Sequence, residues 1–167
     1  MRLRIQSFSA PSSVSKGKMF MKKHVFVITL VIFILVVGLS FLFAGESVSF
    51  KVVVNSENPV DSMGRDEVSK LFLKKVGSWA NGVTSLPVDQ LGTAEVREKF
   101  SKDIHGKSVA TIKNYWQQQI FSGRNAPPPE KASDDEVLSY VKSNTGAIGY
   151  VSGKADTGEV KVLKVTK

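Results

Sequence analysis

The sequence contains no cysteine among its 167 residues. This absence excludes a disulfide framework, a thiolate metal site and lipid attachment through a cysteine. Histidine is nearly absent as well: His24 borders an N-terminal apolar run, and His105 is the only histidine in the rest of the chain. A serine nucleophile needs a nearby base. His105 instead lies where a helix is predicted to end, and a cationic side chain there would suit the helix dipole, which favours a structural role.

Two further absences argue against an enzyme. No glycine-rich phosphate loop of the nucleotide-binding type occurs, and no cluster of histidines and carboxylates stands out as a metal site. The adjacent acids Asp134 and Asp135 are explained by the start of a helix. We therefore expect no catalytic residue, no metal and no cofactor.

Acidic residues are missing from residues 1–45, which hold six of the 23 Lys and Arg. The remaining 17 basic residues face all 15 acidic ones, so residues 46–167 carry a net charge of only +2. A body this balanced lacks the electrostatic footprint of a nucleic-acid-binding protein. The basic excess points to targeting, and no nucleic-acid partner is expected.

The N-terminal segment has the pattern of an export signal. Lys22 and Lys23 precede an apolar run at 25–44, and small residues follow at Ala44 and Gly45. Positive flank, apolar core and small residues are typical of a cleavable signal peptide. An uncleaved membrane anchor fits too, because about 20 apolar residues can span a bilayer. Either interpretation places the rest of the chain in the periplasm or in another extracytoplasmic compartment. It would be secreted if the signal is cleaved and anchored in the inner membrane if it is not. In both cases we expect contact with the membrane only through this segment.

Residues 46–167 are long enough for one α/β domain. The β-branched run at 50–54 predicts a strand covered on both faces, and a second strand is expected at 84–89, where Pro87 requires an edge or an end. Apolar spacing predicts helices over 65–75, from Thr93 as N-cap through 104, and over 109–120. Residues 127–129, three prolines, predict an extended surface connector.

The C-terminal part is the most clearly patterned. Ser133 and Glu136 form a capping box that begins a helix to Ser143. The segment 145–151, Thr-Gly-Ala-Ile-Gly-Tyr-Val, predicts a short buried strand. Gly146 would supply a positive φ on leaving the helix, and Gly149 would allow another backbone or a ligand to come close. A closing strand is expected at 159–165, which completes a small mixed sheet flanked by helices.

These segments, in this order, resemble the phosphate-binding proteins of ATP-driven importers, within the periplasmic binding protein group. The resemblance covers about 51–153 and is carried by 54–56, 71–73, 79–82 (Trp-Ala-Asn-Gly), 88–93 (Val-Asp-Gln-Leu-Gly-Thr) and 146–151 (Gly-Ala-Ile-Gly-Tyr-Val). It implies a single lobe of the type II periplasmic-binding-protein fold, preceded here by the N-terminal hydrophobic helix. Full-length members of the family have two lobes, so this body corresponds to one.

The resemblance also implies a ligand site at the strand-to-helix junction. In the family this junction carries an arginine, an aspartate and a Ser-Gly-Thr sequence, of which Asp89, Gly92 and Thr93 are kept, while Pro87 and Leu91 replace the arginine and the serine. Free amide groups at the start of a helix bind anions. Arg97 either compensates for the lost arginine or pairs with an acid on the surface. The candidate ligand-binding residues are Asn55, Ser56, Asp89, Gln90, Gly92, Thr93 and Arg97.

Two functions follow from these observations. The first is an exported protein that binds phosphate or a similar small oxyanion, weakly on its own or with the site completed by a membrane transport complex or a second copy. The second is a membrane-anchored envelope module that keeps the fold without the ligand. Its contacts would be aromatic: Trp79, Tyr115, Trp116 and Phe121.

Overall fold

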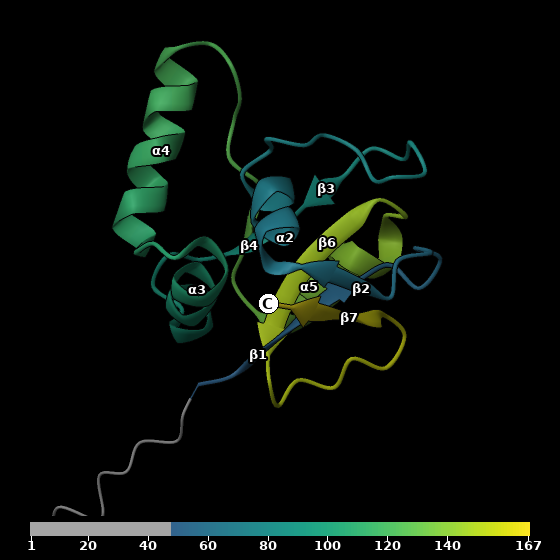
Figure 1. Ribbon diagram of the computed structural model, residues 1–167. Coiled ribbons are helices and arrows are strands. Elements are labelled where there is room, and N and C mark those ends of the chain that lie inside the picture. Colours follow the sequence, from purple (N-terminus) through teal and green to yellow (C-terminus); the bar gives the residue numbers. More distant parts are fainter. Residues whose placement is uncertain (1–47) are drawn as a thin grey trace, which may run out of the picture. The chain divides into compact units, whose positions relative to one another are not determined.

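A computed structural model describes residues 48–167, which belong to one compact unit, Ser47–Lys167 (Figure 1). The predicted apolar segment at 25–44 lies outside the described residues. Within 48–167, no helix has both the length and the hydropathy to cross a bilayer. The helices and strands are, in chain order, β1 (Phe50–Val54), β2 (Ser62–Gly64), α2 (Arg65–Phe72), β3 (Leu86–Pro87), β4 (Asp89–Gln90), α3 (Glu95–Phe100), the π-helical turn η2 (Ser101–His105), α4 (Val109–Phe121), β5 (Glu130–Lys131), α5 (Asp134–Ser143), β6 (Ala147–Ser152) and β7 (Lys161–Thr166).

Five of the strands form a mixed sheet in the order β2-β7-β1-β6-β3, as the sequence predicted in outline. The central strand β1 runs antiparallel to β6 and β7, whereas β2 and β3 pair in parallel at the two edges. Pro87 lies on edge strand β3, where its missing N–H removes no bond from the interior of the sheet. The edge position predicted for this proline is confirmed.

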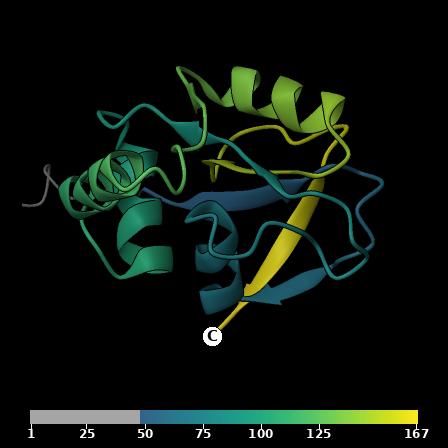
Figure 2. The same ribbon diagram turned by 90° about the horizontal axis from the view of Figure 1, so that it is seen from above.

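Helices cover both faces of the sheet, with α5 on one side and α2 and α3 on the other (Figure 2). Alternate residues of β1 separate between the two cores: Val52 and Val54 pack toward α2 and α3, and Val53 packs toward α5. This explains the three consecutive valines at 52–54, because the part of a strand that is buried on both faces has no position for a polar side chain. Burying each valine contributes about 1.5–3 kcal/mol.

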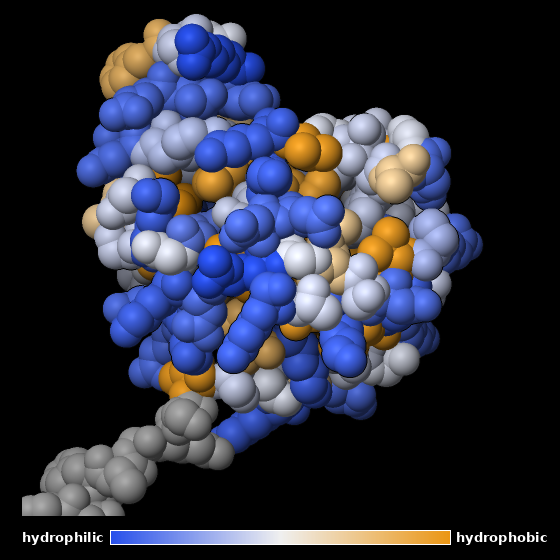
Figure 3. All heavy atoms as spheres, in the orientation of Figure 1, coloured by the Kyte–Doolittle hydropathy of each residue, from blue (hydrophilic) through white to orange (hydrophobic). Residues whose placement is uncertain are grey.

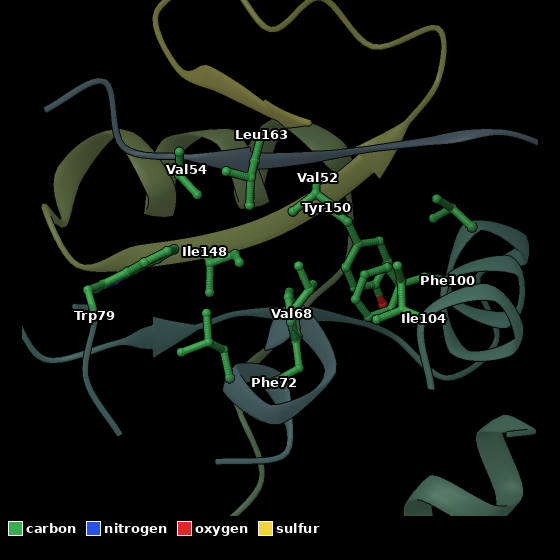
Figure 4. Packing of buried hydrophobic residues seen from close by; sticks show 12 residues of the cluster. Val52, Val54, Val68, Phe72, Trp79, Phe100, Ile104, Ile148, Tyr150 and Leu163 are labelled. Carbon is green, nitrogen blue, oxygen red and sulfur yellow. The ribbon is translucent and has the colours of Figure 1, made fainter. Parts of the chain in front are cut away.

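An aromatic cluster fills the core on the α2 and α3 side (Figure 4). The rings of Phe100 and Tyr150 stack with centroids 3.8 Å apart and an interplanar angle of 5°. Phe72 lies against both rings, at 4.7 Å from Phe100 and 5.8 Å from Tyr150. Because its ring is fixed between helices and sheet, Tyr150 has a single position for its hydroxyl group.

Several predicted boundaries differ from the structure. Helix α2 ends at Phe72 rather than at residue 75, and Lys74 adopts a φ of 50° after it. The strand expected at 84–89 is two strands, because β3 pairs with β6 while β4 turns away to pair with β5. Pro127 and Pro129 are exposed in the extended connector, but Pro128 is buried.

Thr93 is not the N-cap of α3, contrary to the prediction. The cap is Ala94, which has no side-chain capping bond, and the helix begins at Glu95. Gly92 and Thr93 lie instead in a turn closed by a 2.9 Å bond from the Ala94 N–H to the Leu91 carbonyl. Helix α3 continues without a break into η2, so the helical segment runs from Glu95 to His105 and begins after Gly92 and Thr93.

His105 was expected to be a cation that suits the dipole at a helix end. This reason is wrong, although the contacts of His105 are structural. His105 lies near Ser69, with its Nδ1 2.8 Å from the hydroxyl oxygen, and its ring meets Phe72 and Phe100 edge-on. Burial, together with the positive charges of Arg97 and Lys75, lowers its pKa to about 4. The ring is therefore neutral near pH 7 and does not act as a cation at a helix end.

Gly146 does not adopt the positive φ that was predicted; the described glycines that do are Gly82, Gly106, Gly123 and Gly158. A glycine is required at 146 for space, because a Cβ there would overlap the carbonyl oxygen of Thr84. Gly149 does allow a close approach, but the neighbours are side chains and not the predicted backbone. A Cβ there would lie 2.7 Å from a Val137 methyl of α5 and 2.9 Å from a Val88 methyl.

We expect Gly146→Ala to lower the free energy of unfolding by about 1–3 kcal/mol, because the β3–β6 junction must open to admit the methyl group. Urea unfolding of the full chain measures the change. Gly77→Ala is the matched control, since a Cβ there meets nothing within 4 Å, and it should stay within about 0.5 kcal/mol of the parent. Equal stability of the two variants would contradict the packing argument.

Candidate functional site

Asp89 is the centre of a buried polar cluster at the end of the sheet. Its Oδ1 accepts a hydrogen bond from the hydroxyl of Tyr150, pairs with Nη1 of Arg97, and accepts from the backbone N–H of Gln90 at 3.0 Å. The Tyr150 hydroxyl oxygen also lies 3.4 Å from Arg97 Nη1. Asp89 and Arg97 are 4% and 3% exposed, so this ion pair lies inside the protein.

The topology explains how these groups meet. Asp89 lies on β4, Arg97 follows in α3 after the turn at 92–93, and Tyr150 reaches both from the middle of β6. From the sequence, Arg97 was expected either to bind the ligand or to form an ion pair with an acid on the surface. The structure pairs it with an acid, but in the interior.

Burial and neighbouring charges set the protonation states in this cluster. Burial lowers the pKa of Arg97, while the nearby Tyr150 and Glu130 oppose the shift, and a guanidinium stays protonated in proteins. Burial also raises the pKa of Tyr150 to about 12, against the opposing effect of Arg97, so the phenol is neutral and donates. In the part of the chain that the structure describes, Arg97 Nε is buried without a hydrogen-bond partner.

Gln90 extends the cluster toward α5 and has a structural role. Its Nε2 donates to Asp134 Oδ1 at 2.7 Å and to the Tyr150 carbonyl at 3.1 Å. Asp134 in turn accepts from the N–H and the hydroxyl of Ser152, at 3.1 and 2.6 Å. The first residue of α5 is thereby attached to β6, which adds to the N-cap bond from the Glu136 N–H to Ser133 Oγ at 3.3 Å.

Of the seven predicted ligand residues, only Asp89 and Arg97 line the cavity described next; Gln90, Gly92 and Thr93 are not part of its lining, and Asn55 and Ser56 lie after β1. Asn55 is buried, and its Nδ2 donates to the carbonyls of Val141 and Lys142, both at 2.9 Å, at the end of α5. These bonds satisfy carbonyls that a helix end leaves free. Ser56 is exposed, and neither residue lines the cavity described next.

A cavity of about 200 Å³ opens beside the ion pair, between α4, the proline connector and the β4–β5 pair. Apolar side chains come to the surface where the protruding helix α4 meets the rest of the domain (Figure 3). The charged lining residues are two acids and two bases, and the others are mainly apolar: Asp89, Glu130, Arg97 and Lys113, with Trp116, Gln117, Ile120, Pro127 and Pro128.

Lys113 is the residue that sequence reasoning missed. Its Nζ lies 2.8 Å from the place where a Cβ on Gly92 would stand, so the end of the lysine lies against this glycine. A signal did exist: Lys113, Trp116, Gln117 and Ile120 are spaced for one face of a helix. The predicted corner at Gly92 and Thr93 thus has a lysine beside it, with Gly92 half-buried and Thr93 exposed.

The aromatic residues suggested for docking are mostly not surface residues. Trp79 and Trp116 are 4% and 6% exposed, and the indole of Trp79 donates to the Gly146 carbonyl at 2.9 Å. Phe121, at the end of α4, is 90% exposed. Tyr115 is half-buried and donates its hydroxyl to the Leu73 carbonyl at 3.0 Å, so Phe121 is the one of the four that is fully exposed.

Solved structures share this fold, although no protein-family model and no curated protein matches the sequence. A phosphate ABC transporter substrate-binding protein from Clostridium perfringens, with bound phosphate, aligns at a TM-score of 0.56 and 18% identity over 71% of this chain and 45% of its own. A phosphate transport receptor from Vibrio cholerae gives 0.54 and 17% over 71% and 46%. PstS from Borrelia burgdorferi gives 0.52 and 11% over 72% and 48%.

The chain thus spans less than half the length of each of these proteins. At such low identity the likeness concerns the fold alone. Residues 48–167 have the fold of part of the binding proteins that serve phosphate transport.

Proposed function

We propose that this domain is an extracytoplasmic receptor module that binds a small oxyanion of the phosphate type. The observation that carries the proposal is the position of Lys113, whose ammonium group lies beside Gly92 at the turn predicted to receive the anion. Arg97 lines the same cavity and has a buried Nε without a partner among the described residues. Two cations at one small cavity are the donors that an oxyanion requires.

The resemblance at Asp89, Gly92 and Thr93 supports the same ligand. The arginine that the family has at the position of Pro87 is missing, but Arg97 brings a guanidinium to Asp89 from the following helix. The phosphate bound to the Clostridium perfringens protein is consistent with this assignment. Export through the segment at 25–44, and completion of the site by a second copy or a membrane transport complex, belong to the same proposal.

The expected affinity is low. Each hydrogen bond to a charged group contributes about 1.5–3 kcal/mol, so two cationic donors supply about 3–6 kcal/mol. A millimolar dissociation constant corresponds to about 4 kcal/mol. Asp89 and Glu130 also line the cavity and oppose a multiply charged anion, which favours a singly charged, protonated form.

Titration calorimetry of the full-length chain with inorganic phosphate tests the proposal. We expect millimolar binding by the parent and a loss of about tenfold in Lys113→Gln, because one charged donor is removed. Lys113 is exposed, so the variant should fold normally.

Lys107→Gln is the control, since Lys107 is an exposed lysine just before α4 that does not line the cavity. It should bind phosphate like the parent. Parental affinity in Lys113→Gln would show that the anion binds elsewhere, and no heat of binding for any oxyanion would refute the proposed function.

A further inference from the structure

The cavity is larger than inorganic phosphate requires. Its volume is about 200 Å³, which is the space of roughly six or seven water molecules at about 30 Å³ each. A phosphate ion has five heavy atoms and would occupy only part of it. A ligand that fills the cavity has a body attached to its anionic head group.

The residues that line the cavity carry charges of both signs. At the strand end, Glu130 is the direct neighbour of Asp89 in the parallel pairing of β4 and β5, and both acids line the cavity. Arg97 is the one buried cation paired there, and its Nη1 is bonded to Asp89. Asp89 and Arg97 therefore compensate each other, which leaves Glu130 as the acid of the lining without an ion pair among the described residues.

In the described part of the chain, the basic residue of the lining without an ion pair is Lys113 of α4. Lys113 projects from α4 to the turn at Gly92, and within residues 48–167 neither Lys113 nor Glu130 takes part in an ion pair. An inorganic anion would satisfy Lys113 and leave Glu130 without a partner. A ligand that carries an ammonium group as well as an oxyanion would satisfy both.

Part of the cavity wall is apolar, formed by Trp116 and Ile120 of α4 and by Pro127 and Pro128 of the connector. Such a wall suits the hydrocarbon part of a small organic molecule and gives nothing to a fully hydrated ion. The volume of the cavity, the charges of its lining and its apolar residues therefore all indicate the same class of ligand.

We infer that the physiological ligand is a zwitterionic organic oxyanion, with a phosphonate, phosphate or carboxylate head at Lys113, an amine at Glu130 and a short apolar body against Trp116. This inference rests on the proposed function, because it places the oxyanion head at the same lysine. It goes further in assigning Glu130 as the residue that selects the amine.

The test compares three probes by titration calorimetry on the full-length chain: aminoethylphosphonate, ethylphosphonate and inorganic phosphate. Aminoethylphosphonate and ethylphosphonate share the head and the two-carbon body and differ in the amine. We expect aminoethylphosphonate to bind about tenfold more tightly than the other two, since a charged hydrogen bond contributes about 1.5 kcal/mol or more.

Glu130→Gln should remove this preference and leave the binding of ethylphosphonate unchanged or stronger. Glu130 is exposed, so the variant should fold, and a thermal melt verifies it. Glu98→Gln, at an exposed acid of α3 outside the cavity, should keep the preference. Equal binding of the two phosphonates, or a preference that survives Glu130→Gln, overturns the inference while the proposed function stands; no binding of any probe overturns both.

Discussion

Replacing Arg97 by leucine should lower the free energy of unfolding by about 3–5 kcal/mol, because it leaves the carboxylate of Asp89 buried without its counter-charge. Asp89 is 4% exposed, and the side chains of the pair are almost fully enclosed. The Tyr150 hydroxyl and the Gln90 N–H would still donate to Asp89 Oδ1, so the loss should fall short of that for an isolated buried charge. Urea unfolding at neutral pH measures the change.

A second substitution separates charge from packing. Asp89→Asn combined with Arg97→Leu removes both charges, and the double variant should be more stable than Arg97→Leu alone. Lys142→Gln is the control for a surface ion pair: Lys142 and Glu159 have side chains 60% and 67% exposed. Such pairs contribute about 0–1 kcal/mol. If Arg97→Leu is no more destabilising than Lys142→Gln, the buried pair does not stabilise the domain.

The size of this effect bears on function. A buried ion pair is weak evidence for stability, since well-packed apolar residues often replace it without loss. Here the pair lines a cavity and is bonded to Tyr150, and Arg97 Nε has no hydrogen-bond partner within residues 48–167. These features are consistent with an arginine that is held in place for a ligand, as the proposed function requires.

The sequence predicted well what depends on neighbouring residues. The strand at Phe50–Val54, the helix start at Ser133 and the edge position of Pro87 follow from side-chain branching, capping and a missing N–H, and the structure confirms all three. Helix α4 was also expected, and it begins at Val109 as predicted. Each of these features is determined within a few residues.

Features that depend on tertiary contacts were not predictable in the same way. Gly146 was assigned a backbone role, yet it is required by the carbonyl of Thr84, which lies far away in the sequence. Tyr150 was placed in a buried strand, but its hydroxyl bond to Asp89 spans 61 positions. Lys113 is brought to Gly92 by the packing of α4, and no local pattern specifies that approach.

The prediction for Arg97 shows where local reasoning stops. Arg97 lies eight positions after Asp89, its partner in the structure. Pairing with an acid was one of the two alternatives that the sequence left open. Whether such a pair lies at the surface or in the interior depends on tertiary packing, which here includes Tyr150 of β6, 53 positions from Arg97.

Lowering the pH from 7 to 5 should destabilise the domain by up to about 2 kcal/mol through His105 alone. Its pKa is lowered to about 4 in the folded protein by burial, Arg97 and Lys75, against about 6.5 in the unfolded chain. Between these two values the unfolded chain binds a proton that the folded protein does not, so stability falls as the pH falls. The contribution of His105 to the free energy of unfolding is complete above about pH 6.5 and is lost progressively as the pH falls toward about 4.

The variant His105→Gln isolates the contribution of the histidine to the pH dependence of stability. Glutamine can still bond the hydroxyl of Ser69, which lies 2.8 Å from His105 Nδ1, but it does not titrate. Carboxylates contribute equally to both proteins, so the difference between their unfolding free energies, measured by urea at several values of pH, reports on the histidine. We expect that difference to change by about 2 kcal/mol between pH 7 and 5. A constant difference would mean that the ring between Phe72 and Phe100 accepts a proton as readily as in water, and that the packing around η2 is looser than the edge-on contacts of 6.4 and 5.4 Å indicate.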